Sequence, residues 1–130
     1  MSAKWKTHVR VYNGTKRMLL SSRSEMARSF CARLIGLLGR RALDPDGGLW
    51  LVPSNSVHTI GMRFPIDVVL LNRNSTVVAV HQSVPSFSVV WPNFRAKSVL
   101  ELPAETIART ATEPGDVLRI EIVPAENACQ

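Results

Sequence analysis

The chain has 130 residues, of which 45% are hydrophobic and 20% are charged, with a formal net charge of +6. This composition is typical of a folded globular domain and excludes a largely disordered chain. No apolar run approaches the roughly 18 residues that a membrane-spanning helix needs, so no membrane span is predicted. The length suits a single domain with one core. We place this domain at residues 1–123 and expect a flexible tail at 124–130.

The N-terminus and the cysteines favour a cytoplasmic location. Residues 1–17 lack the apolar stretch of a secretory signal. The two cysteines, Cys31 and Cys129, form no zinc-binding pattern. A disulfide between them would have to tie the penultimate residue to the body of the domain, which is unusual for a structural bridge. We therefore expect both thiols to remain reduced.

Basic charge is concentrated in the first 41 residues. This segment holds ten of the 16 Lys and Arg residues and a single acid, whereas the remaining 89 residues hold six basic and nine acidic residues. Such asymmetry can mark a surface for nucleic acid or anionic lipid. We favour a solvated basic face that keeps the protein soluble, because the segment has few aromatic residues and no nucleic-acid-binding motif.

A β-hairpin is predicted near the N-terminus, over residues 8–20. Val9 and Val11 alternate with polar neighbours, as in a strand with one buried face. Asn13-Gly14 supplies the two residues that a type I′ hairpin turn requires.

A helix is predicted next, from about residue 23 to residue 34. Ser22 followed three residues later by Glu25 forms a capping box, the pattern that commonly starts a helix. Apolar residues then recur at four-residue spacing, at Met26, Phe30 and Leu34.

The rest of the chain predicts short strands separated by turns. We expect these strands at about 49–52, 57–62, 66–71, 76–80, 97–102 and 117–123. Pro103 favours the start of a short helical turn near 103–109. Strands outnumber helices, so we expect a mainly β domain. Its predicted form is an antiparallel β-sandwich or barrel-like fold with the helix at 23–34 closing one side or end.

The stretch from Pro53 to Leu71 places polar residues inside an apolar run, where they are unfavourable unless paired or used. A bend at Gly61 or Pro65 could bring His58 and Asp67 within hydrogen-bonding reach. A His oriented by a carboxylate serves general acid–base catalysis or fixes a metal ligand. Alternatively, Asp67 caps backbone N–H groups and His58 bonds a carbonyl. We favour this structural role, because no activated nucleophile accompanies the pair.

A metal site is the weaker hypothesis for the same segment. His58, Asp67 and His81 could supply three ligands if their strands lay side by side. Their separations of 9 and 14 residues match no diagnostic metal-binding spacing. We therefore predict no metal site and no cofactor.

Six stretches of the chain carry a family resemblance. They are ARLIGLLGRRAL (32–43), the Gly-Leu-Trp strand after Gly47, SVHTIGMRFPIDVVLL (56–71), VVAV (77–80), VLELPA (99–104) and PGD (114–116). In this order they resemble the prokaryotic family known as domain of unknown function 192, over about residues 22–123. The resemblance implies a compact β-rich domain and no established activity. Members of that family usually carry Gly at the position of Glu105, and an Asp/Gly-rich turn at that of Asn72 to Ser75.

Our first functional hypothesis is a non-enzymatic domain that binds a small molecule or a protein partner. Its groove would be lined by the His58–Asp67 segment and by the loop that contains Phe87 and Trp91. The ligand-binding candidates are His58, Thr59, Met62, Arg63, Asp67 and Trp91. The alternative is a small hydrolase-like or metal-assisted enzyme that uses His58 and Asp67. A weaker alternative is nucleic-acid or anionic-surface binding through the basic N-terminal third.

Overall fold

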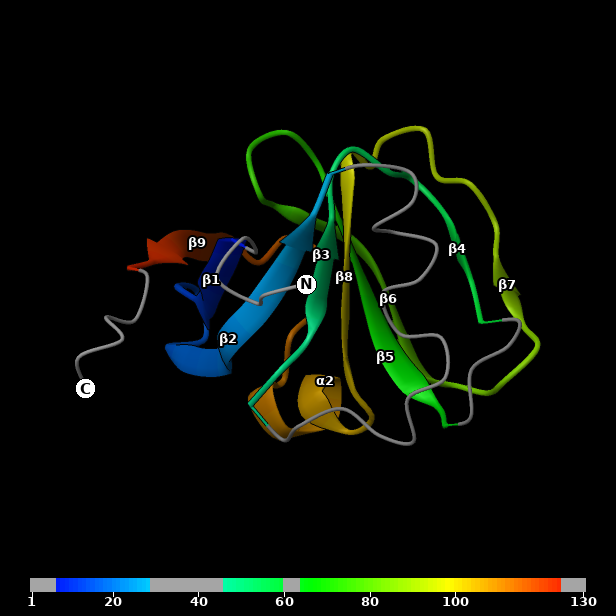
Figure 1. The fold of residues 1–130 in the computed structure, drawn as a ribbon, viewed down its shortest axis with the longest axis horizontal. Coiled ribbons are helices and arrows are strands. Elements are labelled where there is room, and N and C mark those ends of the chain that lie inside the picture. Colours follow the sequence, from blue (N-terminus) through cyan, green and yellow to red (C-terminus); the bar gives the residue numbers. More distant parts are fainter. Residues whose placement is uncertain (1–6, 29–45, 60–63, 125–130) are drawn as a thin grey trace.

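The chain forms a mainly β fold, as predicted (Figure 1). The computed structural model describes residues 7–28, 46–59 and 64–124. Its elements are β1 (Thr7–Asn13), β2 (Met18–Ala27), β3 (Leu49–Leu51), β4 (Val57–His58), β5 (Ile66–Leu71), β6 (Val77–Val84), β7 (Val89–Val90), β8 (Ser98–Pro103), α2 (Thr106–Thr110) and β9 (Leu118–Val123). Among the described residues, no helix is long and apolar enough to cross a membrane. The predicted flexible tail falls almost entirely on 125–130, outside the described residues.

Seven strands form one curved sheet in the order β6-β5-β8-β3-β2-β1-β9, and β4 pairs with β7 in a separate two-stranded sheet. The pairing is antiparallel as predicted, except that β2 and β3 run parallel. The two edge strands approach each other at one end, where Thr76 bridges Val117 and the Val77 N–H donates to the Asp116 carbonyl at 2.8 Å. This contact is confined to the start of β6 and β9, so the described strands form an open sheet and not a closed barrel.

The helix predicted at 23–34 is wrong over residues 23–27, which belong to β2. Residues 29–34 lie outside the described part of the chain. Glu25 pairs with His8 of β1 on one side and with Leu49 of β3 on the other. Because β2 pairs along both edges, its backbone N–H and C=O groups are hydrogen-bonded to β1 and β3. These bonds outweigh the helix preference of a local capping pattern.

The N-terminal hairpin is confirmed, but its turn differs from the predicted one. Asn13 still belongs to β1 and pairs with Met18, so the turn contains the four residues 14–17. The Asn13 Oδ1 atom accepts the Lys16 N–H at 2.9 Å, which closes this longer turn. The short helical turn predicted near 103–109 is also confirmed, as α2.

The core lies on both faces of the seven-stranded sheet. β5 is buried along its whole length, and its side chains alternate between the two faces. Val68 and Leu70 pack on the face that the β4-β7 sheet covers through Val90. Val69 and Leu71 pack on the other face, which the short helix α2 closes from the end of β8 (Figure 1). The apolar run in β5 therefore reflects its central place in the sheet.

Glu105, which precedes α2, adopts a left-handed backbone conformation with φ 78° and ψ 0°. A β-carbon is unfavourable in this conformation by about 1–2 kcal/mol. We expect Glu105→Gly to raise the free energy of unfolding by about 1 kcal/mol, since the greater freedom of Gly in the unfolded chain offsets part of the gain.

Chemical denaturation of the two proteins measures this difference. Ala108→Gly is the matched control, because Ala108 is an exposed residue inside α2, where Gly should destabilise by about 1 kcal/mol. A loss of stability in Glu105→Gly would contradict the strain argument.

Candidate functional site

Asp67 lies on β5 and is completely buried. Its two carboxylate oxygens accept two backbone N–H groups that are distant in sequence. Ser83 N–H donates to Oδ1 and Ile107 N–H donates to Oδ2, both at 2.8 Å. Ser83 lies near the end of β6, and Ile107 lies in the first turn of α2, which has no side-chain cap of its own. Asp67 therefore ties β6 and α2 to the central strand.

His58 pairs through its backbone with Val89 of β7. The position of its side chain lies outside the described part, as do Met62 and Arg63. The hypothesis of a His58–Asp67 pair thus stays a prediction. The Asp67 carboxylate, however, already has a backbone partner on each oxygen, as the structural role requires.

Thr59 is buried and fixes the loop between β6 and β7. Its hydroxyl donates to the Pro85 carbonyl at 2.7 Å and accepts the Ser88 N–H at 2.7 Å. Its own N–H donates to the Ser88 carbonyl at 2.8 Å. These bonds hold the loop that carries Phe87, so Thr59 supports the surface and does not itself reach solvent.

An open groove of about 690 Å³ lies between β6 and the segment that contains β7. Residues 79–82 and 84 line it from β6, and residues 88–93 line it from the other side. Of the six predicted ligand-binding residues, Trp91 lines this groove, whereas Thr59 and Asp67 do not. The groove adjoins the central motif through the pairing of Val89 with His58.

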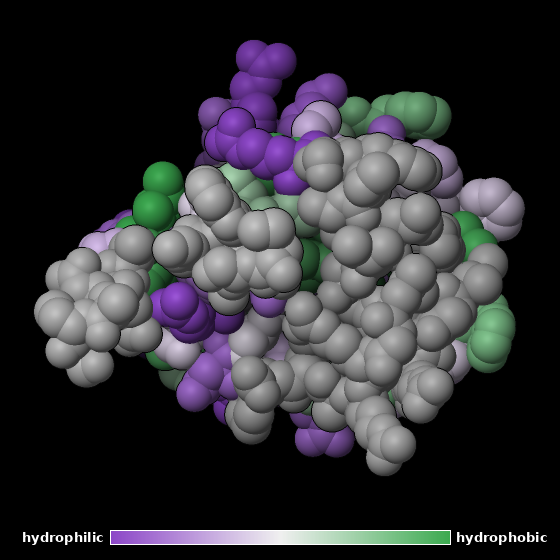
Figure 2. All heavy atoms as spheres, viewed as in Figure 1, coloured by the Kyte–Doolittle hydropathy of each residue, from purple (hydrophilic) through white to green (hydrophobic). Residues whose placement is uncertain are grey.

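Large hydrophobic side chains are exposed around this groove. Phe87 is 73% exposed, Trp91 79% and Phe94 83%, and Val89 is half exposed at 50%. Figure 2 shows hydrophobic residues reaching the surface at the edge of the molecule where β7 lies. The sequence indicated Phe87 and Trp91 as exposed aromatics between two prolines, but Phe94 was not singled out.

Glu101 is a buried acid in the strand predicted at about 97–102, and it is not among the predicted site residues. It is 4% exposed and lies on β8 between Leu49 of β3 and Val68 of β5. Burial raises the pKa of Glu101 to about 8. Among the described residues, no hydrogen bond or ion pair engages its side chain. The sequence does contain an indication of this burial, because Glu101 is the one charged residue in the apolar stretch Val-Leu-Glu-Leu.

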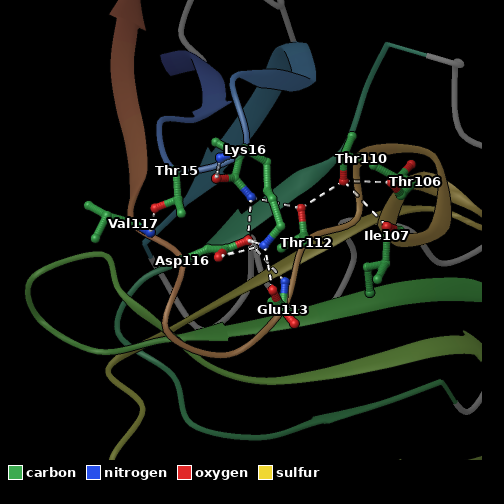
Figure 3. Close-up of polar contacts among 10 residues, drawn as sticks. Thr15, Lys16, Thr106, Ile107, Thr110, Thr112, Glu113, Asp116 and Val117 are labelled. Carbon is green, nitrogen blue, oxygen red and sulfur yellow. Dashed lines mark hydrogen bonds and ion pairs between the residues drawn. The ribbon is translucent and has the colours of Figure 1, made fainter.

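A polar cluster joins the β1-β2 hairpin to the turn before β9 (Figure 3). The Asn13 amide donates to Asp116 at 2.9 Å and to Thr112 at 3.1 Å. The Lys16 ammonium donates to Glu113 at 2.7 Å and to Asp116 at 2.9 Å. These partners raise the pKa of Lys16. Each group already has a partner within the cluster, so the geometry favours a clamp between the two segments over a ligand site.

The same cluster bears on the pKa of Asp116, which is 3% exposed. Burial alone would raise this pKa. Hydrogen bonds from Asn13, Lys16 and the Glu113 N–H outweigh burial and lower it.

Two residues of the basic N-terminal third have acidic partners from the C-terminal part. Besides Lys16, the Arg10 guanidinium lies 3.4 Å from the Glu121 carboxylate. Arg10 also lies over the Tyr12 ring, with 5.5 Å between the guanidinium carbon and the ring centroid. Part of the basic charge is thus paired within the fold.

The hypothesis of a metal site requires His58, Asp67 and His81 to converge. Both Asp67 oxygens accept backbone N–H groups, and His81 is exposed on β6. Among the described residues, no three His, Cys, Asp or Glu side chains are grouped so that they could hold a metal ion.

Comparison with known proteins gives a family and several similar folds. A model of the DUF192 family, described as Uncharacterized ACR, matches residues 11–120. No curated protein matches the chain.

Several solved structures are similar to the chain, and three are described below. A proposed transcription regulator from Sinorhizobium meliloti 1021 has a TM-score of 0.75 and 24% identity, over 88% of this chain and 93% of that one. A protein of unknown function from Novosphingobium aromaticivorans DSM 12444 has a TM-score of 0.71 and 22% identity, over 88% and 84% of the two chains. A proposed exported protein from Burkholderia pseudomallei K96243 has a TM-score of 0.51 and 13% identity, over 94% of this chain and 27% of that one. At these identities the likeness concerns the fold alone.

Proposed function

The chain belongs to the DUF192 family of uncharacterised proteins, and from this premise we propose that it is a non-enzymatic domain that binds a partner. The binding surface is the groove between β6 and residues 88–93, together with its exposed aromatic side chains. A cytoplasmic location, as the two cysteines favour, forms part of the proposal.

The observation that carries the proposal is the concentration of exposed apolar side chains at this groove. The described part of the chain has seven exposed large hydrophobic residues, and four of them lie between residues 87 and 94. Two of these four, Val89 and Trp91, line the groove. Isolated exposed hydrophobic residues are ordinary, but exposed apolar side chains that line a concave surface are typical of an interaction site. Aromatic residues also supply much of the binding energy in protein interfaces.

The enzymatic alternative has less support from the described residues. It requires Asp67 to orient His58 or to act in proton transfer, but the Asp67 carboxylate is buried and accepts two backbone N–H groups. Freeing Oδ2 would leave the buried Ile107 N–H without a partner, and freeing Oδ1 would leave the partly buried Ser83 N–H without one. Asp67 is therefore better suited to hold the scaffold beneath the groove.

The nucleic-acid alternative rests on the basic N-terminal third. The Sinorhizobium protein is named as a transcription regulator, and that name would agree with such a role. Against it, Arg10 and Lys16 already have acidic partners within the chain. Binding to a nucleic acid needs protein cations that are free to neutralise its phosphates, which releases the counterions condensed on the nucleic acid.

A Trp91→Ala variant tests the proposed function. Peptides selected from a random displayed library against the full chain are synthesised and titrated by calorimetry. We expect Trp91→Ala to weaken their binding by about tenfold or more, the usual effect of removing an aromatic anchor. The melting temperature should stay nearly unchanged, because Trp91 is 79% exposed.

Ile122→Ala is the matched control, since Ile122 is 69% exposed on β9, away from the groove. Peptides selected by the groove should bind this variant as they bind the original chain. The groove would be refuted as the binding surface if both variants lost peptide affinity equally. It would also be refuted if no selected peptide bound Trp91→Ala more weakly than the original chain.

A further inference from the structure

β6 is an edge strand, and most of its outer side is open. It forms one end of the seven-stranded order and pairs with β5 alone along its length. At its first residue, Val77, the N–H and the carbonyl bond to Asp116 and Gly115, each at 2.8 Å. Among the described residues, no hydrogen bond occupies the outer backbone groups of residues 78–82.

This edge has no charged or proline residue that would prevent strand pairing, and its irregularities are the two register shifts opposite Ile66–Val68 and Leu70–Leu71. Native edge strands commonly carry Lys or Pro, which prevent another chain from adding to the sheet. β6 reads VVAVHQSV, with no lysine, arginine, acid or proline. Its only titratable side chain is that of His81, which is exposed. The strand is thus open to a further strand at the edge that borders the groove.

The sequence around the groove-lining residues is basic and contains no acid. Between Asp67 and Glu101 the sequence contains no acidic residue. It contains three cationic residues there, Arg73, Arg95 and Lys97, and all three are exposed. Among the described residues, none of the three forms an ion pair. Arg95 and Lys97 come two and four residues after Asn93, the last of the residues 88–93 that line the groove.

We propose that the groove takes an extended, acidic peptide segment, which adds to the edge of β6 as a further strand. This inference rests on the function proposed above and names its partner class. In strand addition, backbone hydrogen bonds supply affinity and alternate side chains supply specificity. Here one row of peptide side chains would pack on the groove near Trp91 and Val89. Acidic side chains of the peptide would be attracted by the exposed cations Arg95 and Lys97, which follow the groove-lining segment.

Other anionic partners fit these observations less well. A nucleic acid or a membrane surface needs several clustered cations, and each would leave the open backbone edge of β6 unused. A peptide in extended conformation uses the edge, the apolar groove and the cations together.

The test uses the full chain and a capped synthetic octapeptide in which Val and Glu alternate. Two derivatives are N-methylated at alternate residues, so that each loses the donors along one of its two edges. Strand addition uses a single edge of the peptide. We therefore expect one derivative to bind at least about tenfold more weakly and the other to bind like the parent peptide. Amide hydrogens of residues 78–82 should gain protection from exchange when the parent peptide binds.

Charge is tested with a peptide in which Lys replaces Glu, and with an Arg95→Glu, Lys97→Glu double variant. Both changes should weaken binding by about tenfold. Arg119→Glu, on β9, is the control and should leave binding unchanged. Equal binding of the two N-methylated peptides would refute strand addition, and equal binding of the Lys peptide would refute the acidic partner.

Two further outcomes separate this inference from the proposed function. Anionic vesicles or a single-stranded oligonucleotide could bind in a Trp91-dependent way while the acidic peptide does not bind. The inferred partner would then be wrong, and the groove would remain a binding surface. If no peptide, vesicle or oligonucleotide binds in a Trp91-dependent way, both proposals fail.

Discussion

Replacing Asp67 with Ala should lower the free energy of unfolding by roughly 4 kcal/mol. The variant leaves the Ile107 N–H without an acceptor in the core and the Ser83 N–H without one in a partly buried position. A buried unsatisfied donor costs about 1–3 kcal/mol. The truncated side chain also leaves a small void. Urea denaturation at neutral pH measures the loss.

Asp67→Asn distinguishes this explanation from a simple loss of volume. Asn has the same shape but one carbonyl oxygen, so it can accept one of the two N–H groups and turns a donor toward the other. Its stability should lie between those of the original chain and Asp67→Ala. Ser83→Ala is the control, because it keeps the backbone N–H and removes only an exposed hydroxyl. If Asp67→Ala were no less stable than Ser83→Ala, the Asp67 carboxylate would not be holding β6 and α2.

The strands were predictable from sequence because their side-chain patterns are local. Val9 and Val11 alternate with polar residues, and the apolar run of β5 has the composition of a central strand, so both were recognised. The second half of β2 was not, because residues 22–26 contain a capping box and no clear alternation. Pairing with β1 and β3 decides its conformation, and the partner in β3 lies more than twenty residues away in sequence. A local pattern carries no information about such pairing.

The candidate site was predictable only in part, for the same reason. The sequence indicated that Asp67 needs a partner. The two N–H groups that donate to its carboxylate belong to Ser83 and Ile107, which lie 16 and 40 residues further along the chain. Trp91 was indicated by its position between turn-forming residues. The groove itself depends on how residues 88–93 lie beside β6, which is a property of the tertiary structure. The residue types thus indicated which side chains, such as Asp67 and Trp91, are unusual in their local sequence. Their roles depend on how the chain packs in three dimensions.

Glu101→Gln should remove a pH dependence from the stability of the domain. The pKa of Glu101 is raised from 4.5 to about 8 in the folded chain. Between these values the unfolded chain has released the proton and the folded chain keeps it. Stability therefore falls as pH rises through this window, by about 1.4 kcal/mol per pH unit from this group alone. Gln has nearly the same shape and no proton to release, so the variant lacks this slope.

The expected result is a stability difference between the two proteins that changes with pH, measured by two urea-denaturation series. Relative to the original chain, Glu101→Gln should gain on the order of 3 kcal/mol between pH 5 and pH 8. Other titrating groups are common to both proteins and cancel in this difference. Glu105→Gln removes one negative charge from an exposed side chain and controls for net charge. A Glu101→Gln difference that stayed constant across pH would mean that Glu101 is ionised and solvated in the fold. A pH-dependent difference would instead establish a neutral carboxylic acid in the centre of the sheet, where it can donate a hydrogen bond at neutral pH.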